Sequence, residues 1–191
     1  MGLDRSQVLQ DLGVTVVSLP LEIHPEIPVG GLSLAERWAS HYGEAMAMYE
    51  RIERECEAAG LPFNRPERVP NTKRALATAE WARRHAPEAA AALERALFHA
   101  HFVDNRPLDD PAVVDELVEA SAADAAEARR AVEAGEVDEQ VAAAHAAAGH
   151  LGIRGTPAWL LDGRILIPGA VARDVFRSAI SQLQDSGAGE T

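Results

Sequence analysis

Cys56 is the single cysteine among 191 residues, and its position limits the thiol chemistry that the chain can perform. Disulfide exchange through a protein's own dithiol needs two cysteines, so these residues cannot carry it by themselves. Cys56 follows Ala45, Tyr49 and Ile52 at steps of three or four residues, which places it on the apolar face of an expected helix. The pattern therefore predicts a buried and unreactive thiol.

The histidines do not form a metal-binding pattern. His99 and His101 are two residues apart, and such residues point to different sides of a helix. His145 and His150 lack the i, i+4 spacing of a helical zinc pair. The sequence also contains no Gly-x-Ser-x-Gly nucleophile elbow and no phosphate-binding glycine loop. We therefore expect no metal site, no serine hydrolase triad, no catalytic residue of another kind and no cofactor.

Charge and hydropathy exclude two classes of partner. The chain has 30 acidic and 18 basic residues, and the basic residues are scattered, with no run longer than Arg83-Arg84 or Arg129-Arg130. A net charge of −12 repels nucleic acid. No apolar stretch approaches the roughly 18 residues of a membrane span, and the first residues lack a secretory signal. We expect a cytoplasmic protein with no nucleic acid or membrane partner.

The first half of the chain predicts a short helix, a strand and then a long run of helices. A helix is expected over residues 4–12, and β-branched residues predict a strand over residues 14–23. From Ser33 to about Leu151, apolar residues recur at helical spacing with no convincing strand. The first part of this run predicts one long helix that ends at Gly60.

The last forty residues predict a β-hairpin and a helix. Residues 158–161 and 164–167 are apolar and flank Asp162-Gly163, a pair that suits a turn in which both central residues have positive φ. A helix follows, with Val175, Phe176 and Ala179 on its apolar side. Residues 186–191 have the small polar composition of a flexible tail.

This order of elements resembles the DsbA-like branch of the thioredoxin fold, in particular its cytoplasmic FrnE-type oxidoreductases. The resemblance extends over nearly the whole chain, because several short segments are similar and follow the same order. These segments are Leu21-Glu-Ile-His-Pro-Glu-Ile-Pro28, Leu61-Pro-Phe-Asn64, Val69-Pro-Asn-Thr72, Leu151-Gly-Ile-Arg-Gly-Thr-Pro157, Leu161-Asp-Gly163 and Pro168-Gly169.

The resemblance implies an α/β, thioredoxin-like fold with a large all-helical insertion. The thioredoxin-like domain would then consist of residues 1–32 and 151–185, the insertion of residues 33–150, and the tail of residues 186–191. In the family, a first strand and a Cys-x-x-Cys motif precede the first helix, whereas this sequence begins at what would be that helix. We therefore expect the first strand and the reactive cysteine pair to be missing, and lower stability, a partner strand or a homodimer as the consequence.

The same resemblance implies five substrate-binding residues. In the family, the proline that corresponds to Pro157 is cis, and the backbone before it faces the substrate. Gly155 and Thr156 would thus offer backbone groups to an extended peptide. His24 and Asn71 lie in segments similar to those that border the family's site, although a turn at His24 and a helix cap at Asn71 are the favoured explanations of these two residues.

Three functions follow from the resemblance. The first is a DsbA-family thiol–disulfide oxidoreductase that acts on a protein or small-molecule thiol or disulfide, and that is inactive as a dithiol enzyme in this chain. The second is an enzyme similar to the glutathione-dependent 2-hydroxychromene-2-carboxylate isomerases, in which a serine can stand at the start of the first helix. The third is a non-catalytic thioredoxin-like module that binds peptides.

Overall fold

The computed structural model describes residues 2–187, with side chains described from Gln7 to Asp185, and divides the chain into two compact units. The first unit is formed by the two ends of the chain, up to Ser18 and from Ala146 onward, and the second by residues 19–145. Both junctions lie earlier in the chain than the domain boundaries expected at residues 32 and 150, which stay a prediction. Of the expected tail, residues 188–191 lie outside the described residues.

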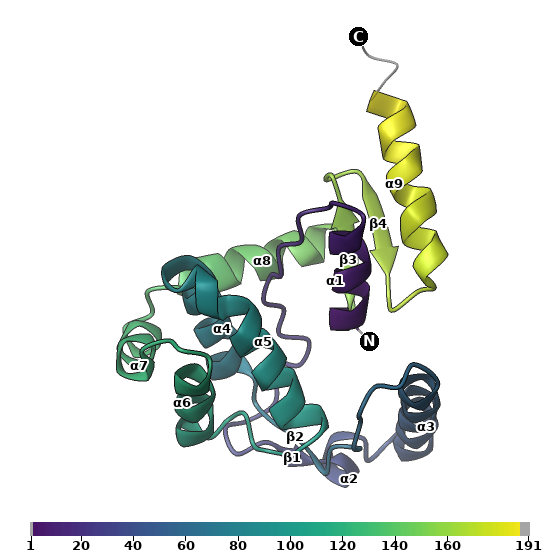
Figure 1. Cartoon of the computed structure of the whole chain (residues 1–191). Helices are drawn as coiled ribbons and strands as arrows, with labels where there is room; N and C mark the ends of the chain where they lie inside the picture. Colours follow the sequence, from purple (N-terminus) through teal and green to yellow (C-terminus); the bar gives the residue numbers. More distant parts are fainter. Residues whose placement is uncertain (1, 188–191) are drawn as a thin grey trace. The chain divides into compact units, whose positions relative to one another are not determined.

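The first unit packs two helices against a β-hairpin. Figure 1 shows α1 (Gly2–Asp11) and α9 (Arg173–Gly187) beside the strands β3 (Ala158–Leu161) and β4 (Ile165–Pro168). The ring of Trp159 meets the ring of Phe176 edge to face, with centroids 5.3 Å apart. The core of this unit consists of Leu9, Leu161, Ile167, Phe176 and Ala179.

The predicted hairpin is confirmed, with a loop one residue longer than expected. β3 and β4 are antiparallel, and Leu161 pairs with Ile165, so Arg164 belongs to the turn rather than to the strand. Asp162 and Gly163 both have positive φ, and the Arg164 N–H donates to the Leu161 carbonyl at 3.0 Å. This geometry explains why the Asp-Gly pair was an informative signal.

The strand predicted over residues 14–23 does not form. Val14 and Val16 pack against the core of the first unit, whereas the side chain of Val17 is directed to solvent and the residue is 59% exposed. The side chains therefore alternate as they would in a strand. The N–H of Val14 donates to the Leu9 carbonyl, but no strand pairs with residues 14–18 among the described residues. The prediction was wrong because β-branched residues favour extended backbone, whereas a strand also needs a partner.

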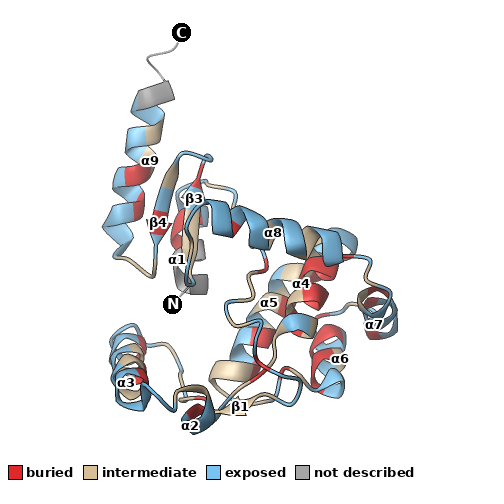
Figure 2. Cartoon of the chain, turned by 180° about the vertical axis from the view of Figure 1, so that it is seen from behind, coloured by how far each residue is buried: buried red, intermediate tan, exposed pale blue. Residues whose placement is uncertain are grey.

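The second unit is mainly helical, as the periodicity predicted. Figure 2 shows that α4 and α6 each carry buried residues on one side, and the core of the unit is rich in alanine. Small side chains let helices approach closely without a deep apolar layer. The helices are α2 (Leu34–Arg37), α3 (Tyr42–Ala58), α4 (Lys73–His85), α5 (Pro87–Phe102), α6 (Pro111–Ala120), α7 (Ala125–Glu133) and the first part of α8 (Asp138–His150).

The long helix predicted to end at Gly60 is instead two helices. α2 begins with a capping box in which Ser33 and Glu36 bond reciprocally, and it ends at Arg37, with Trp38 as its C-cap. The chain turns at residues 38–41 before α3 begins. The turn leaves the Trp38 ring edge-on to the ring of His24, with centroids 6.1 Å apart. A tertiary contact of this kind accompanies the interruption of a periodicity that would otherwise favour one helix.

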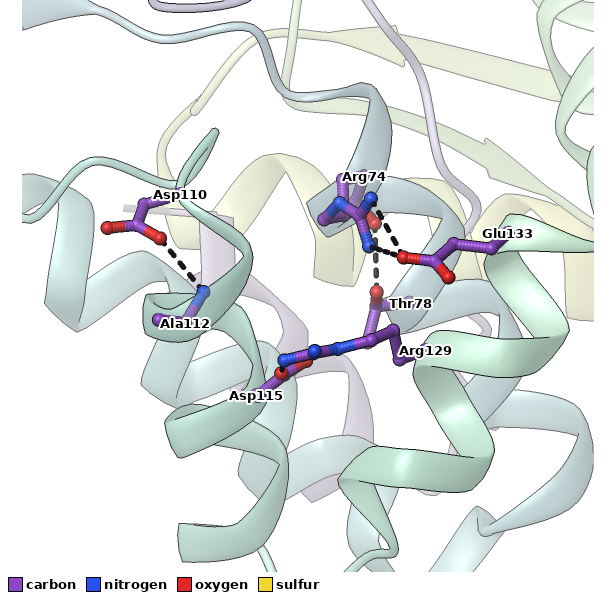
Figure 3. Close-up of polar contacts among 7 residues, drawn as sticks. All are labelled: Arg74, Thr78, Asp110, Ala112, Asp115, Arg129 and Glu133. Carbon is purple, nitrogen blue, oxygen red and sulfur yellow. Dashed lines mark hydrogen bonds and ion pairs between the residues drawn. The ribbon is translucent and has the colours of Figure 1, made fainter.

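Polar contacts join the helices of the second unit at its surface (Figure 3). Arg74 of α4 pairs with Glu133 of α7 at 3.4 Å, and Arg129 of α7 pairs with Asp115 of α6. Asp110 caps α6 by accepting from the Ala112 N–H at 2.9 Å. Because such surface pairs contribute only about 0–1 kcal/mol each, we assign most of the stability of this unit to its core.

A two-residue β-bridge lets the chain pass very close to itself at Gly31. β1 (Leu32–Ser33) pairs antiparallel with β2 (Arg68–Val69), with Leu32 opposite Val69. Gly31 has φ of +65°, and a Cβ atom added there would lie 2.7 Å from the Val69 carbonyl oxygen. Gly30 has φ of +92°, but a Cβ atom there would meet nothing within 4 Å.

We predict that Gly31→Ala destabilises the protein more than Gly30→Ala. Both substitutions place a side chain at positive φ, which costs roughly 1–2 kcal/mol, but only Gly31→Ala adds a clash with backbone that cannot move aside easily. The free energy of unfolding, measured with urea, should fall by at least about 1 kcal/mol more for Gly31→Ala. Equal losses for the two variants would mean that the close approach to Val69 does not exist in solution.

Burial of His101 makes the stability of the second unit depend on pH. The His101 ring lies at the end of α5, with its centroid 4.4 Å from that of Phe102, and burial lowers its pKa to about 4. A histidine in the unfolded chain has a pKa of about 6.5. Between about pH 4 and pH 6.5, His101 is therefore protonated in the unfolded chain and neutral in the folded chain. The contribution of His101 is therefore complete above pH 6.5 and is lost as the pH falls towards 4.

We predict that His101→Gln weakens this pH dependence. Between pH 7 and pH 4, the wild-type protein should lose roughly 2–3 kcal/mol more of its unfolding free energy than the variant, because glutamine does not titrate. Urea unfolding at several pH values gives the two curves. His41→Gln, at an exposed position, is the control and should follow the wild type. Parallel curves for wild type and His101→Gln would contradict the assignment.

Candidate functional site

Gly155, Thr156 and Pro157 form the turn that leads into β3. The peptide bond between Thr156 and Pro157 is cis. The Pro157 carbonyl accepts from the Gly169 N–H at 2.7 Å, and the Gly169 carbonyl accepts from the indole N–H of Trp159 at 3.2 Å. These two bonds fix the start of β3 against the end of β4, so the turn stands on a rigid support.

Backbone groups at this turn are free to bind. Gly155 and Thr156 are exposed, and neither the N–H nor the carbonyl of Thr156 has a hydrogen-bond partner among the described residues. β3 pairs with β4 along one edge, and its other edge has no strand partner in the part of the chain that the structure describes. A free edge of this kind can pair with an extended peptide.

An apolar pair lies on the outer face of the same hairpin. Leu160 and Leu166 are directly opposite each other and are 45% and 36% exposed. Their neighbours Leu161 and Ile167 point the other way, into the core. The hairpin therefore offers both backbone groups along its edge and apolar side chains on its outer face.

His24 belongs to a polar cluster in the second unit. Its Nδ1 lies 2.9 Å from Nη2 of Arg37 and 3.3 Å from a carboxylate oxygen of Glu26. The Arg37 guanidinium also lies 4.3 Å from the centroid of the Trp38 ring. The pKa of Glu26 is lowered, mainly by a backbone hydrogen bond; burial opposes this effect, and the nearby His24 and Arg37 lower the pKa further. His24 thus has an arginine, a carboxylate and an indole around it.

Two hydrogen-bond donors in this cluster have no signal in the sequence. Nε of Arg37 and Nε1 of Trp38 are buried and have no acceptor among the described residues. Periodicity had assigned Trp38 to the apolar face of a helix, and no motif singled out Arg37. The unpaired N–H groups of these adjacent residues could each donate a hydrogen bond to an acceptor such as a carboxylate. A sequence pattern does not reveal unpaired groups, because their lack of partners follows from tertiary structure.

Asn71 uses both ends of its side chain to hold the structure. Its Oδ1 accepts from the Lys73 N–H at 3.1 Å, at the start of α4, and its Nδ2 donates to the Ile27 carbonyl at 2.7 Å. The first bond satisfies a free N–H of the helix terminus, and the second ties the loop around Ile27 to α4. The geometry therefore supports the structural interpretation of Asn71, and its role in substrate binding stays a prediction.

The predicted site residues fall into two groups. Gly155, Thr156 and Pro157 are contiguous in the first unit, whereas His24 and Asn71 are in the second unit. Within the second unit, the two contact the same stretch of chain: His24 lies in the loop, and Asn71 bonds to the loop at Ile27. These contacts make the two residues supports for one loop.

Cys56 is buried, as predicted. Its residue is 5% exposed within α3, and burial raises the pKa of its thiol, so the thiol stays protonated and is a poor nucleophile at neutral pH. Among the described residues, no group of three or more His, Cys, Asp or Glu side chains is arranged to hold a metal ion. No helix within residues 2–187 is long and apolar enough to cross a membrane.

Comparison with known proteins identifies the family of the chain. The family model described as DSBA-like thioredoxin domain matches residues 2–181. A probable DsbA oxidoreductase from Streptomyces coelicolor has a similar structure, with 23% identity and a TM-score of 0.83 over 100% of this chain and 84% of that one. A 2-hydroxychromene-2-carboxylate isomerase is also similar, with 21% identity and a TM-score of 0.67 over 100% of this chain and 91% of that one.

No curated protein in the comparison matched the chain. The two solved structures show the fold, which is the expected thioredoxin-like α/β fold with a helical insertion. The family match extends over both compact units and includes the turn before β3 as well as the loop around His24. On this match, the chain belongs to the family of DSBA-like thioredoxin domains.

Proposed function

We propose that this chain supplies the substrate-holding surface of a DsbA-like thiol–disulfide oxidoreductase. The observation that carries the proposal is the unpaired backbone at Thr156, which continues into the free edge of β3. An extended peptide that pairs with both would satisfy backbone groups on each side, as an added strand does. The residues that bind it are Gly155, Thr156 and Pro157, and the affinity comes mainly from backbone hydrogen bonds.

The reactive thiol is not part of this proposal. Dithiol exchange proceeds through a thiolate that attacks a disulfide sulfur, and a second thiol resolves the mixed disulfide. Cys56 has neither the accessibility nor the lowered pKa that attack requires. Thiols for such a reaction are not found among these 191 residues, so we assign to them only the binding of the substrate.

Glutathione is a second candidate ligand for the same backbone. The groups left unpaired before Pro157 are one N–H and one carbonyl of a single residue, Thr156. A tripeptide satisfies such a pair as completely as a longer chain does. A glutathione-dependent isomerase would use the same edge with a small-molecule substrate, and the length of the preferred ligand distinguishes the two functions.

We predict that Thr156→Pro weakens peptide binding and that Thr156→Val does not. Proline removes the N–H of residue 156, whereas valine keeps the backbone and removes only the hydroxyl. The probe is a fluorescently labelled eight-residue peptide rich in valine and threonine, with a central S-methylated cysteine. Fluorescence anisotropy should give a dissociation constant at least about tenfold higher for Thr156→Pro, while Thr156→Val stays within about twofold of the wild type.

Circular dichroism shows whether each variant keeps its fold, and a fold-intact Thr156→Pro with unchanged affinity would refute the proposal. If the proline variant does not fold, protection of the Thr156 amide from hydrogen exchange by the bound peptide decides instead. S-methylglutathione is added as a competitor in a separate titration. Displacement of the peptide by S-methylglutathione at equal affinity would favour the tripeptide as the natural ligand.

A further inference from the structure

The contact between His24 and Arg37 ties the loop around Ile27 to the end of α2. The His24 carbonyl accepts from the Ile27 N–H at 3.1 Å, which closes a turn, and Ile27 itself is buried. Arg37 is the last residue of α2. The side chains of His24 and Arg37 are 33% and 19% exposed, so solvent ions screen the contact between them only partly.

Nδ1 of His24 lies between a group that only donates hydrogen bonds and a group that only accepts them. Nη2 of Arg37 is 2.9 Å from Nδ1 and 3.5 Å from Nε2, and a carboxylate oxygen of Glu26 is 3.3 Å from Nδ1. A guanidinium has no acceptor, so the bond with Arg37 requires Nδ1 without a proton. A carboxylate has no donor, so a bond with Glu26 requires Nδ1 with a proton. One nitrogen atom cannot satisfy both requirements at once.

The charge of the His24 ring decides which of the two contacts is a hydrogen bond. Among the described residues, the charged groups in contact with this ring are Glu26 and Arg37, and the neighbouring Trp38 ring is uncharged. Arg37 keeps its charge, and the pKa of Glu26 is lowered, mainly by a backbone hydrogen bond. Imidazole is the side chain that gains a proton between about pH 8 and pH 5. A protonated ring would face the like charge of Arg37 at 2.9 Å, which is unfavourable.

We propose that His24 is a pH-operated latch between its loop and α2. In the neutral state, Nδ1 accepts from Arg37, and the loop is tied to the helix. In the protonated state, Nδ1 donates to Glu26 within the loop, and the Arg37 side chain is repelled from the ring. Ile27 stays in place in both states, because it is buried and its carbonyl accepts from Asn71 at 2.7 Å. The change is therefore confined to the contacts of the His24 side chain.

Nuclear magnetic resonance of the full chain tests the latch on the wild-type protein. Imidazole ¹⁵N–¹H spectra show which ring nitrogen carries the proton, and at pH 8 we expect the proton of the neutral His24 ring on Nε2. Nδ1 should gain a proton as the pH falls from 8 to 5. The nuclear Overhauser contact between the His24 ring and the side-chain protons of Arg37 should be present at pH 8 and lost at pH 5.

Two variants separate the partners of the latch. Glu26→Gln removes the carboxylate that the protonated ring binds, and Arg37→Gln removes the competing cation. Proton binding to His24 should become at least about threefold weaker in Glu26→Gln and at least about threefold tighter in Arg37→Gln. Glu44→Gln, which removes an exposed carboxylate from α3, is the matched control and should leave the titration unchanged.

If Arg37→Gln fails to fold, Glu26→Gln and the wild-type spectra decide. Three results would each overturn the proposal. They are a proton on Nδ1 of the neutral ring, an Overhauser contact with Arg37 that persists at pH 5, and equal titrations of His24 in the wild type and in Glu26→Gln.

Discussion

Backbone hydrogen bonding is the constraint on which the first unit depends. A strand buries its peptide groups only when a neighbouring strand pairs with them. Residues 14–17 alternate inward and outward like a strand, and β3 has a free second edge, yet no strand pairs with either among the described residues. The unit is held instead by the side chains of Leu9, Phe176 and their neighbours. The first unit therefore has backbone N–H and carbonyl groups without a strand partner, and these groups are available for binding.

The same constraint explains which predictions from the sequence succeeded. The hairpin rests on local chemistry, since Asp162 and Gly163 can both adopt positive φ without help from the rest of the fold. The strand over residues 14–23 needed a partner that a local pattern does not describe. The prediction of one long helix was wrong for a related reason. Trp38 contacts His24, which lies in an earlier segment of the chain, and periodicity alone did not signal the turn between α2 and α3.

The candidate site residues divide along similar lines. Burial of Cys56 followed from helical spacing, whereas the two bonds of Asn71 and the unpaired donors of Arg37 and Trp38 became visible only in the structure. The resemblance to the family drew attention to Thr156, and the structure adds that its backbone is unpaired. In the second unit, Oδ2 of Asp109 is likewise buried without a partner among the described residues, and no sequence pattern singled it out.

Hydrogen exchange measured amide by amide tests the central claim, that residues 15–18 have an open backbone, most directly. The amides of Val14 and Gly169 donate to the carbonyls of Leu9 and Pro157 at 3.0 and 2.7 Å, so they should be protected. The amides of residues 15–18 should exchange close to the rates of an unstructured peptide. Protection of residues 15–18 equal to that of Val14 and Gly169 in the isolated chain would contradict the account, because it would show that a strand partner is already in place.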